Sequence, residues 1–165
     1  MDMSLIRRGA KYAAALGLAV TIAITSLIKP WEGVRHTPYR DVGGIWTVCY
    51  GHTGPDVTPD KRYTQQECEK LLEYDVQRFS AAVDKYVKVD ISPETRAALI
   101  SFTFNVGIEA FKRSTLLKLL NGGNPIAACN ELTKWNKVKG REIAGLTNRR
   151  KAERVMCLKN VYLPV

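Results

Sequence analysis

The first 48 residues contain no cysteine, and no CxxC pair occurs anywhere in the chain. The four cysteines are Cys49, Cys68, Cys129 and Cys157, and their spacings match no zinc-binding pattern. These absences exclude a cysteine-based zinc site and a thiol switch inside the N-terminal segment. The even number leaves two interpretations open: one or two disulfides in an oxidising compartment, or four buried thiols that behave as small hydrophobic side chains. The sequence does not fix the pairing.

Charge is missing from residues 13–28, a run of sixteen uncharged residues near the N-terminus. Basic residues flank this run on both sides: Arg7, Arg8 and Lys11 before it, and Lys29 after it. As a helix the run would span roughly 24 Å, somewhat less than the ~30 Å hydrocarbon core of a bilayer. Five alanines, one glycine, two threonines and one serine make it only weakly hydrophobic. The run is therefore marginal as a membrane span.

Four interpretations of residues 13–28 are open. The basic flank predicts that the N-terminus stays inside and the remaining chain is exported. A cleaved signal peptide fits this layout, but cleavage near Thr25 or Ser26 would leave Glu32 almost at the new terminus, without a helix to hold it. The other three are a permanent anchor, an uncleaved signal-anchor weak enough to leave the bilayer later, and an ordinary buried helix of a soluble protein.

Acidic residues are scarce near the C-terminus. Residues 131–165 hold nine basic and three acidic side chains, which gives +6 of the net charge of +9, whereas residues 30–130 hold twelve of each. A basic tail is typical of a protein with an anionic partner: nucleic acid, a lipid surface or an acidic wall polymer. It is equally typical of a solvated helix face. Nothing else in the sequence favours nucleic acid.

The chain has no internal repeat and no low-complexity linker. Its 165 residues, 45% of them hydrophobic and 25% charged, are typical of one globular domain. Residues 38–54 are predicted to form strands around a Gly43-Gly44 turn. Helices are predicted from the capping box Thr64–Glu67 and from Ser92-Pro93 onward, over residues 64–86, 92–106, 111–120, 124–135 and about 149–159. We expect an α+β fold in which a small β-hairpin lobe lies between an N-terminal apolar helix and a larger helical lobe, with residues 97–106 as its buried centre.

Two carboxylates and a hydroxyl surround the predicted hairpin: Glu32, Asp41 and Thr47. Glycoside hydrolysis needs one carboxylic acid to protonate the leaving oxygen and one ionised carboxylate to position or deprotonate water. Glu32 lies near the apolar run, where partial loss of solvent favours the protonated acid. Asp41 lies at the mouth of the turn, where backbone and solvent can keep it ionised, and the Thr47 hydroxyl can hold the same water. In the competing interpretation, Glu32 only caps a helix or forms a salt bridge, and Asp41 only stabilises the turn.

The spacing E-x8-D-x5-T, followed by the sequence VCYGHTG at residues 48–54, resembles the phage lysozymes of the bacteriophage T4 type, glycoside hydrolase family 24. The resemblance covers about residues 31–158. The apolar N-terminus is similar to that of the signal-anchor-release (SAR) endolysins of lambdoid phages. The resemblance implies a lysozyme-like α+β fold that hydrolyses the β-1,4 bond between N-acetylmuramic acid and N-acetylglucosamine in peptidoglycan. It also implies Glu32 as proton donor, with Asp41 and Thr47 holding water for an inverting reaction.

The resemblance also implies supporting residues. Gly51 would allow a close backbone approach behind the site, His52 would pair with an acidic group of the helical lobe, and Arg149 would lie close to Glu32. Phe104 and Trp135 are predicted either to line the saccharide cleft or to pack in the core. We expect no cofactor, no metal site and no nucleic-acid partner, and we expect a monomer.

The resemblance further implies two functional segments: residues 1–29 as an uncleaved signal-anchor-release segment, and residues 30–165 as the catalytic domain. The protein would then be tethered to the host inner membrane through residues 13–28, with its catalytic domain in the periplasm, and would later become soluble there. We expect that tethering displaces Glu32 and that release lets it enter the cleft. The alternatives are a lytic transglycosylase, which needs no water, and a non-catalytic protein that binds the wall or perturbs membranes.

Overall fold

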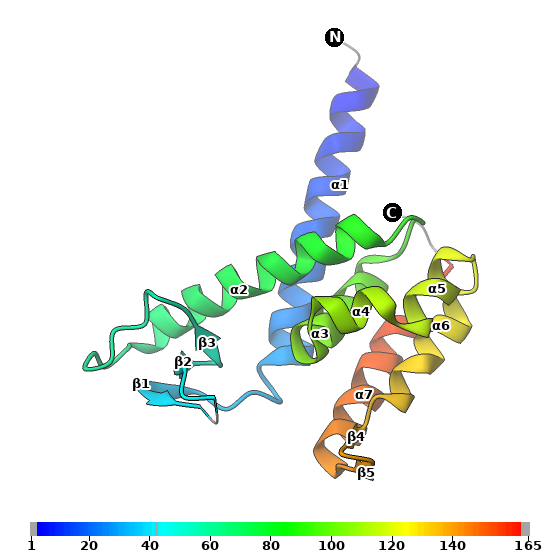
Figure 1. The fold of residues 1–165 in the computed structure, drawn as a ribbon. Helices are drawn as coiled ribbons and strands as arrows, with labels where there is room; N and C mark the ends of the chain where they lie inside the picture. Colours follow the sequence, from blue (N-terminus) through cyan, green and yellow to red (C-terminus); the bar gives the residue numbers. More distant parts are fainter. Residues whose placement is uncertain (1–2, 42, 163–165) are drawn as a thin grey trace.

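The computed structural model describes residues 3–41 and 43–162, with side chains from residue 13 onward. Val42 and the basic side chains of Arg7, Arg8 and Lys11 therefore lie outside the described part. The elements, in chain order (Figure 1), are α1 (Met3–Ile22), a π-helical stretch (Ala23–Ile28), β1 (Arg35–Arg40), β2 (Trp46–Cys49), β3 (His52–Thr53), α2 (Gln65–Tyr86), α3 (Pro93–Val106), α4 (Ile108–Arg113), α5 (Thr115–Asn121), α6 (Pro125–Glu131), a 3-10 turn (Leu132–Lys134), β4 (Lys137–Val138), β5 (Arg141–Glu142) and α7 (Ala144–Leu158).

Helix α3 forms the centre of the larger, helical lobe. It packs against α1, α2 and α7, and every residue from Thr95 to Thr103 is buried. The Ser92 hydroxyl caps its first turn by accepting from the backbone N–H of Thr95, and Gly107 ends it with a φ of 91°. A helix that is apolar nearly all round must be covered on every side, so the predicted buried central helix is confirmed.

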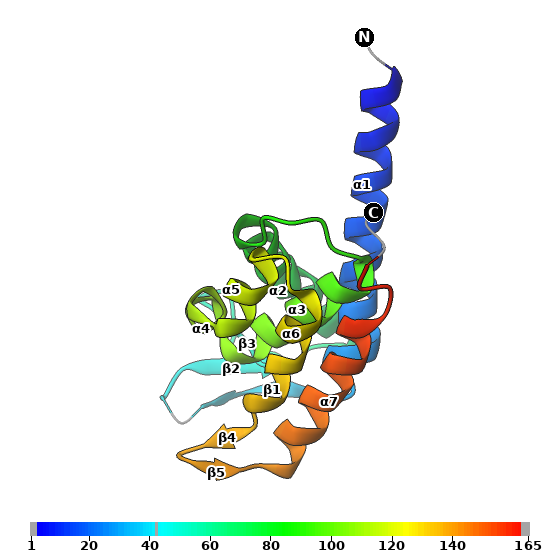
Figure 2. The same cartoon turned by 90° about the vertical axis from the view of Figure 1, so that its right-hand side faces the viewer.

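The N-terminal helix has two parts with different surroundings. Its first turns project away from the body of the molecule (Figures 1 and 2), whereas its last turns run alongside α3. On the packed side, Ala19, Ala23, Leu27 and Ile28 are at most 2% exposed. The small alanine side chains let the helix axis approach α3 closely. Across the described part of the chain, no helix has the length and apolar character needed to span a bilayer.

The β lobe is one antiparallel sheet in the order β1-β2-β3. The predicted Gly43-Gly44 turn joins β1 to β2. It is closed by the Gly44 N–H, which donates to the carbonyl of Asp41 at 2.9 Å, and by the Asp41 N–H, which donates to that of Ile45 at 3.0 Å. On the central strand, Thr47 lies opposite Tyr39 of β1 and Thr53 of β3. Directly opposed residues share one face of a sheet, so this register decides which side chains face the helical lobe.

Two disulfides connect the elements. Cys49–Cys68 joins β2 to α2, and Cys129–Cys157 joins α6 to α7. The interpretation of four free buried thiols was therefore wrong. The first disulfide lies at the junction of the β lobe and the helical lobe, so it fixes the position of the sheet relative to α2.

The structure differs from the predicted elements in three places. The single helix predicted over residues 111–120 is two helices, because the Ser114 hydroxyl accepts from the Leu117 N–H and starts α5 as a new helix. Helix α7 begins at Ala144, before the predicted start. The β4–β5 hairpin was not predicted at all; its turn places Lys139 and Gly140 at φ values of 48° and 78°.

Candidate active site

A cavity of about 300 Å³ lies between the β lobe and the helical lobe. Its lining comes from several segments: Glu32 after the N-terminal helix, Tyr50, Gly51 and Thr53 from the β lobe, Asp75, Arg78 and Phe79 from α2, and Phe104 and Asn105 from the end of α3. A polar cleft between two lobes, with two carboxylates and aromatic walls, has the general character of a ligand site.

Glu32 reaches this cavity from the residues that follow the N-terminal helix. The backbone N–H groups of Trp31 and Glu32 both donate to the carbonyl of Ile28, at 3.0 and 3.1 Å, which extends the helical path by one turn. The Glu32 side chain is 26% exposed, and its Oε1 accepts a hydrogen bond of 2.6 Å from Nη1 of Arg149. Glu32 is thus partly solvated and held by one strong charged contact.

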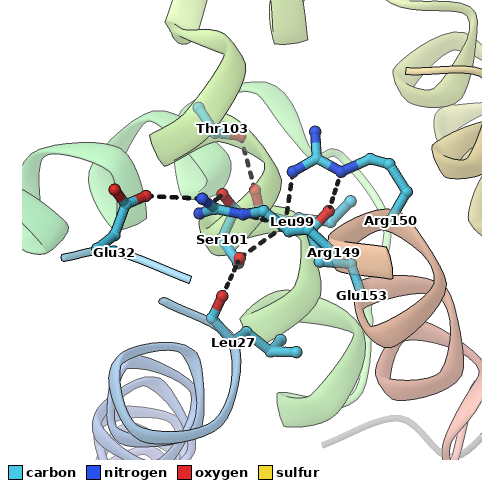
Figure 3. Close-up of polar contacts among 8 residues, drawn as sticks. All are labelled: Leu27, Glu32, Leu99, Ser101, Thr103, Arg149, Arg150 and Glu153. Carbon is cyan, nitrogen blue, oxygen red and sulfur yellow. Dashed lines mark hydrogen bonds and ion pairs between the residues drawn. The ribbon is translucent and has the colours of Figure 1, made fainter. Parts of the chain in front are cut away.

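Arg149 lies in α7, and only 4% of its side chain is exposed. Besides Glu32, its Nε donates to Oε1 of Glu153 at 3.3 Å, and its Nη2 approaches the carbonyl of Ser101 at 3.5 Å. Figure 3 shows the guanidinium lying between Glu32 and the buried Glu153. Arg149 therefore lies beside Glu32, as predicted. Its contacts with Ser101 of α3 and Glu153 of α7 fix its orientation.

Glu153 and Arg150 form the buried end of this group. Both side chains are fully buried, and Nη2 of Arg150 donates to Oε1 of Glu153 at 3.0 Å. Burial raises the pKa of the Glu153 carboxyl, and Arg150, Ser101 and Arg149 oppose this without cancelling it. Burial also lowers the pKa of Arg150, against the attraction of Glu153. Sequence reasoning missed Glu153, because a carboxylate three residues from an arginine on a helix is usually an ordinary surface pair.

Asp41 is held by its own turn. Its Oδ1 accepts from the N–H of Gly43 at 2.8 Å and from the N–H of Ile45 at 2.9 Å. Thr47 is 4% exposed, and its hydroxyl donates to the carbonyl of Ile45 at 3.2 Å. Neither residue lines the cavity itself. However, the register places Thr47 directly opposite Thr53, which does line it, and Asp41 lies just beyond the end of β1.

His52 is 5% exposed and lies between two carboxylates. Its Nδ1 lies 2.9 Å from Oδ2 of Asp75 on α2, and its Nε2 lies 3.2 Å from the carboxylate of Asp56. Burial by itself would lower the pKa of His52, but the hydrogen bonds and the attraction of Asp75 and Asp56 outweigh it, and the pKa is raised. His52 therefore contacts an acidic group of the helical lobe, as the resemblance implied, and it links the two lobes.

Three other predicted residues have distinct surroundings. Gly51 lines the cavity, but a Cβ there would meet nothing within 4 Å, so the close backbone approach was wrong; its φ of 88° is what favours glycine. Phe104 lines the cavity and packs edge-on against Phe79. Trp135 does not line this cavity: its ring packs at 5.2 Å against the buried Phe102, because it follows the end of α6 on another side of α3.

The pattern search also missed Arg78 and Asp75, which line the cavity from α2. The two residues are three positions apart on an amphipathic helix. This spacing indicates a shared site only when the buried face of the helix is known. Within residues 3–41 and 43–162, no group of three or more His, Cys, Asp or Glu side chains is arranged to hold a metal ion.

Comparisons with known proteins agree with this fold. The family model for phage lysozyme matches residues 29–153. A SAR-endolysin of Bacteriophage PS119 is 44% identical over 96% of this chain and 98% of its own length, and one of Bacteriophage PS34 is 42% identical over the same shares. The muramidase domain of SpmX from Asticaccaulis excentricus superposes with a TM-score of 0.74, at 30% identity, over 88% of this chain and 95% of that one. The chain therefore belongs to the phage lysozyme family, alongside the SAR-endolysins.

Proposed function

We propose that this protein is an endolysin that hydrolyses the β-1,4 bond between N-acetylmuramic acid and N-acetylglucosamine in peptidoglycan. The observation that carries the proposal is the position of Glu32, a partly solvated carboxylate in the cavity between the lobes, oriented by the buried Arg149. The family of the chain and the muramidase name of one structural neighbour support the same substrate class.

In the proposed reaction, Glu32 donates its proton to the glycosidic oxygen as the bond to the anomeric carbon breaks. Asp41 and Thr47 hold a water molecule on the opposite side of the sugar, and Asp41 accepts a proton from it as the water attacks. The turn amides of Gly43 and Ile45 support this role, because they fix the Asp41 carboxylate. Attack from the opposite side inverts the anomeric configuration.

We further propose that residues 1–29 act as an uncleaved signal-anchor-release segment and residues 30–165 as the catalytic domain. Residues 13–28 would tether the protein to the host inner membrane, with the N-terminus inside, until it is released as a monomer into the periplasm. The names of the SAR-endolysin relatives support this proposal. The burial of Leu27 and Ile28, five and four residues before Glu32, gives a reason why a tethered helix would leave the site incomplete.

The enzymatic proposal is tested by Glu32→Gln, which keeps the shape of the side chain but removes its acid. We expect clearing of peptidoglycan in a zymogram to fall by at least about a hundredfold, because general acid catalysis contributes about 10²–10⁴. Glu109→Gln is the control, since this carboxylate is 67% exposed on α4 and lies outside the cavity lining. Equal clearing by wild type and Glu32→Gln would refute the enzymatic proposal and favour a non-catalytic wall protein.

Mass spectrometry of the wall fragments separates hydrolysis from the lytic transglycosylase alternative. Hydrolysis in 18O-water places the label on a reducing N-acetylmuramic acid end, because Asp41 and Thr47 deliver water. Unlabelled anhydro ends would show instead that the reaction uses no water and that the roles of Asp41 and Thr47 are wrong.

A further inference from the structure

The fully buried carboxylate of Glu153 joins α7 to α3. Its Oε1 contacts three side chains from two helices: Ser101 Oγ at 2.7 Å, Arg150 Nη2 at 3.0 Å and Arg149 Nε at 3.3 Å. Placing a carboxylate in the protein interior costs free energy unless it is paired and hydrogen-bonded. Here the pairing has a second result, because Arg149 is held on one side by Glu153 and on the other by Glu32 (Figure 3).

The carbonyl of Leu27 contacts the same cluster from the N-terminal helix. Near the end of that helix, Pro30 has no N–H to donate, and the next two N–H groups, of Trp31 and Glu32, both donate to Ile28. The Leu27 carbonyl instead accepts from the Ser101 hydroxyl at 3.0 Å. Because a hydroxyl has one proton, Ser101 shares it between Leu27 and Glu153.

We propose that Ser101 and Glu153 are positioning residues for the proposed hydrolysis, coupling the seating of the last helical turn at Leu27 to the hold of Arg149 on Glu32. The inference rests on the proposed role of Glu32 as proton donor. The segment from Leu27 to Glu32 is then fixed at both ends by one cluster: its carbonyl end by Ser101, and its carboxylate end by Arg149. Neither residue touches substrate; each acts through Arg149.

Thr103 provides a matched control on the same helix. Like Ser101 it is fully buried, and its hydroxyl also donates to a backbone carbonyl, that of Leu99 at 2.7 Å. This bond stays within α3 and reaches neither Glu153 nor the N-terminal helix. Replacing either residue by alanine therefore removes one buried hydroxyl, but only Ser101→Ala disconnects the cluster.

The test measures kcat and KM of the full-length Ser101→Ala and Thr103→Ala variants on soluble peptidoglycan fragments. We expect Ser101→Ala to lower kcat about tenfold with little change in KM, because orientation of the acid acts on the reaction step rather than on binding. Thr103→Ala should change neither quantity.

Amide hydrogen exchange gives a second readout that does not depend on catalysis. In Ser101→Ala, the N–H groups of Trp31 and Glu32 should exchange about tenfold faster than in Thr103→Ala, because the turn that they close loses its attachment to α3.

Glu153→Gln tests the other half of the coupling. It removes the charged partner that holds Arg149 on the side away from Glu32, so it should also lower kcat with little change in KM. A Glu153→Gln variant with unchanged kcat, or a Ser101→Ala variant that matches Thr103→Ala in kcat and exchange, would overturn the inference. Wild-type protein that releases no fragments would instead refute the proposed function itself.

Discussion

At the scale of single residues, the site depends on charged groups with more than one partner. Arg149 contacts Glu32 and Glu153, and His52 contacts Asp75 and Asp56. The family resemblance predicted Arg149 and His52, because each occupies a recognisable motif position. Glu153 and Ser101 were not predicted: they are 52 residues apart in the chain, and only the packing of α7 on α3 brings them together.

The two carboxylates around His52 predict a pH-dependent contribution to stability. Because the pKa of His52 is raised in the folded state, its contribution is fully present below its unfolded pKa of about 6.5 and is lost as the pH rises through the folded pKa. We expect His52→Gln to lower the Tm more at pH 5.5 than at pH 9. Differential scanning calorimetry at both pH values measures the difference. If His52→Gln showed the same cost at pH 5.5 and pH 9, the charged His52 bridge would be wrong.

At the scale of elements, the β lobe is fixed to α2 at several points. The Cys49–Cys68 disulfide, the His52–Asp75 contact and the bond from Gln65 Nε2 to the Tyr50 hydroxyl all join the sheet to this helix. Cys49 has a φ of 59° and lies between Thr47 and the cavity residues Tyr50 and Gly51. This disulfide therefore holds the segment that carries part of the site.

The two disulfides should consequently separate stability from activity. Their sequence separations of 19 and 28 residues predict that each contributes about 3 kcal/mol of stability through the entropy of the unfolded chain. We expect Cys49→Ser/Cys68→Ser and Cys129→Ser/Cys157→Ser to lower the free energy of unfolding similarly. Only the first pair should also lower kcat of the folded enzyme, because only that pair positions the β lobe. Equal kcat values for the two double variants would show that the disulfide does not position the site.

The same elements show what local sequence can predict. The capping box of α2, the Ser92 cap of α3 and the turn between β1 and β2 were all predicted, since each signal lies within a few adjacent residues. The break at Ser114 was missed, because a single serine is also compatible with a continuous helix. The disulfide pairing could not be predicted, because four cysteines allow three connectivities and only the tertiary fold selects one.

At the scale of the whole molecule, the N-terminal helix has one side packed in the core and another side exposed. Ala19, Ala23, Leu27 and Ile28 are buried against the helical lobe, whereas Ala14, Thr21 and Thr25 on the same helix are exposed. The hydroxyls of Thr21 and Thr25 donate to backbone carbonyls of the preceding turn, those of Gly17 and Thr21. The exposed side can therefore be made more apolar without disturbing the packed side.

The central claim is that Glu32 becomes active only when this helix leaves the membrane and packs on α3. The most direct test compares the triple variant Ala14→Leu/Thr21→Leu/Thr25→Leu with wild type in spheroplasts, whose outer membrane face is accessible to soluble peptidoglycan fragments. The substitutions favour membrane insertion by a few kcal/mol in total. We predict that the variant stays in the membrane fraction and cleaves fragments at least about a hundredfold more slowly per molecule than released wild type. A variant that stays in the membrane and cleaves at the wild-type rate would contradict the account.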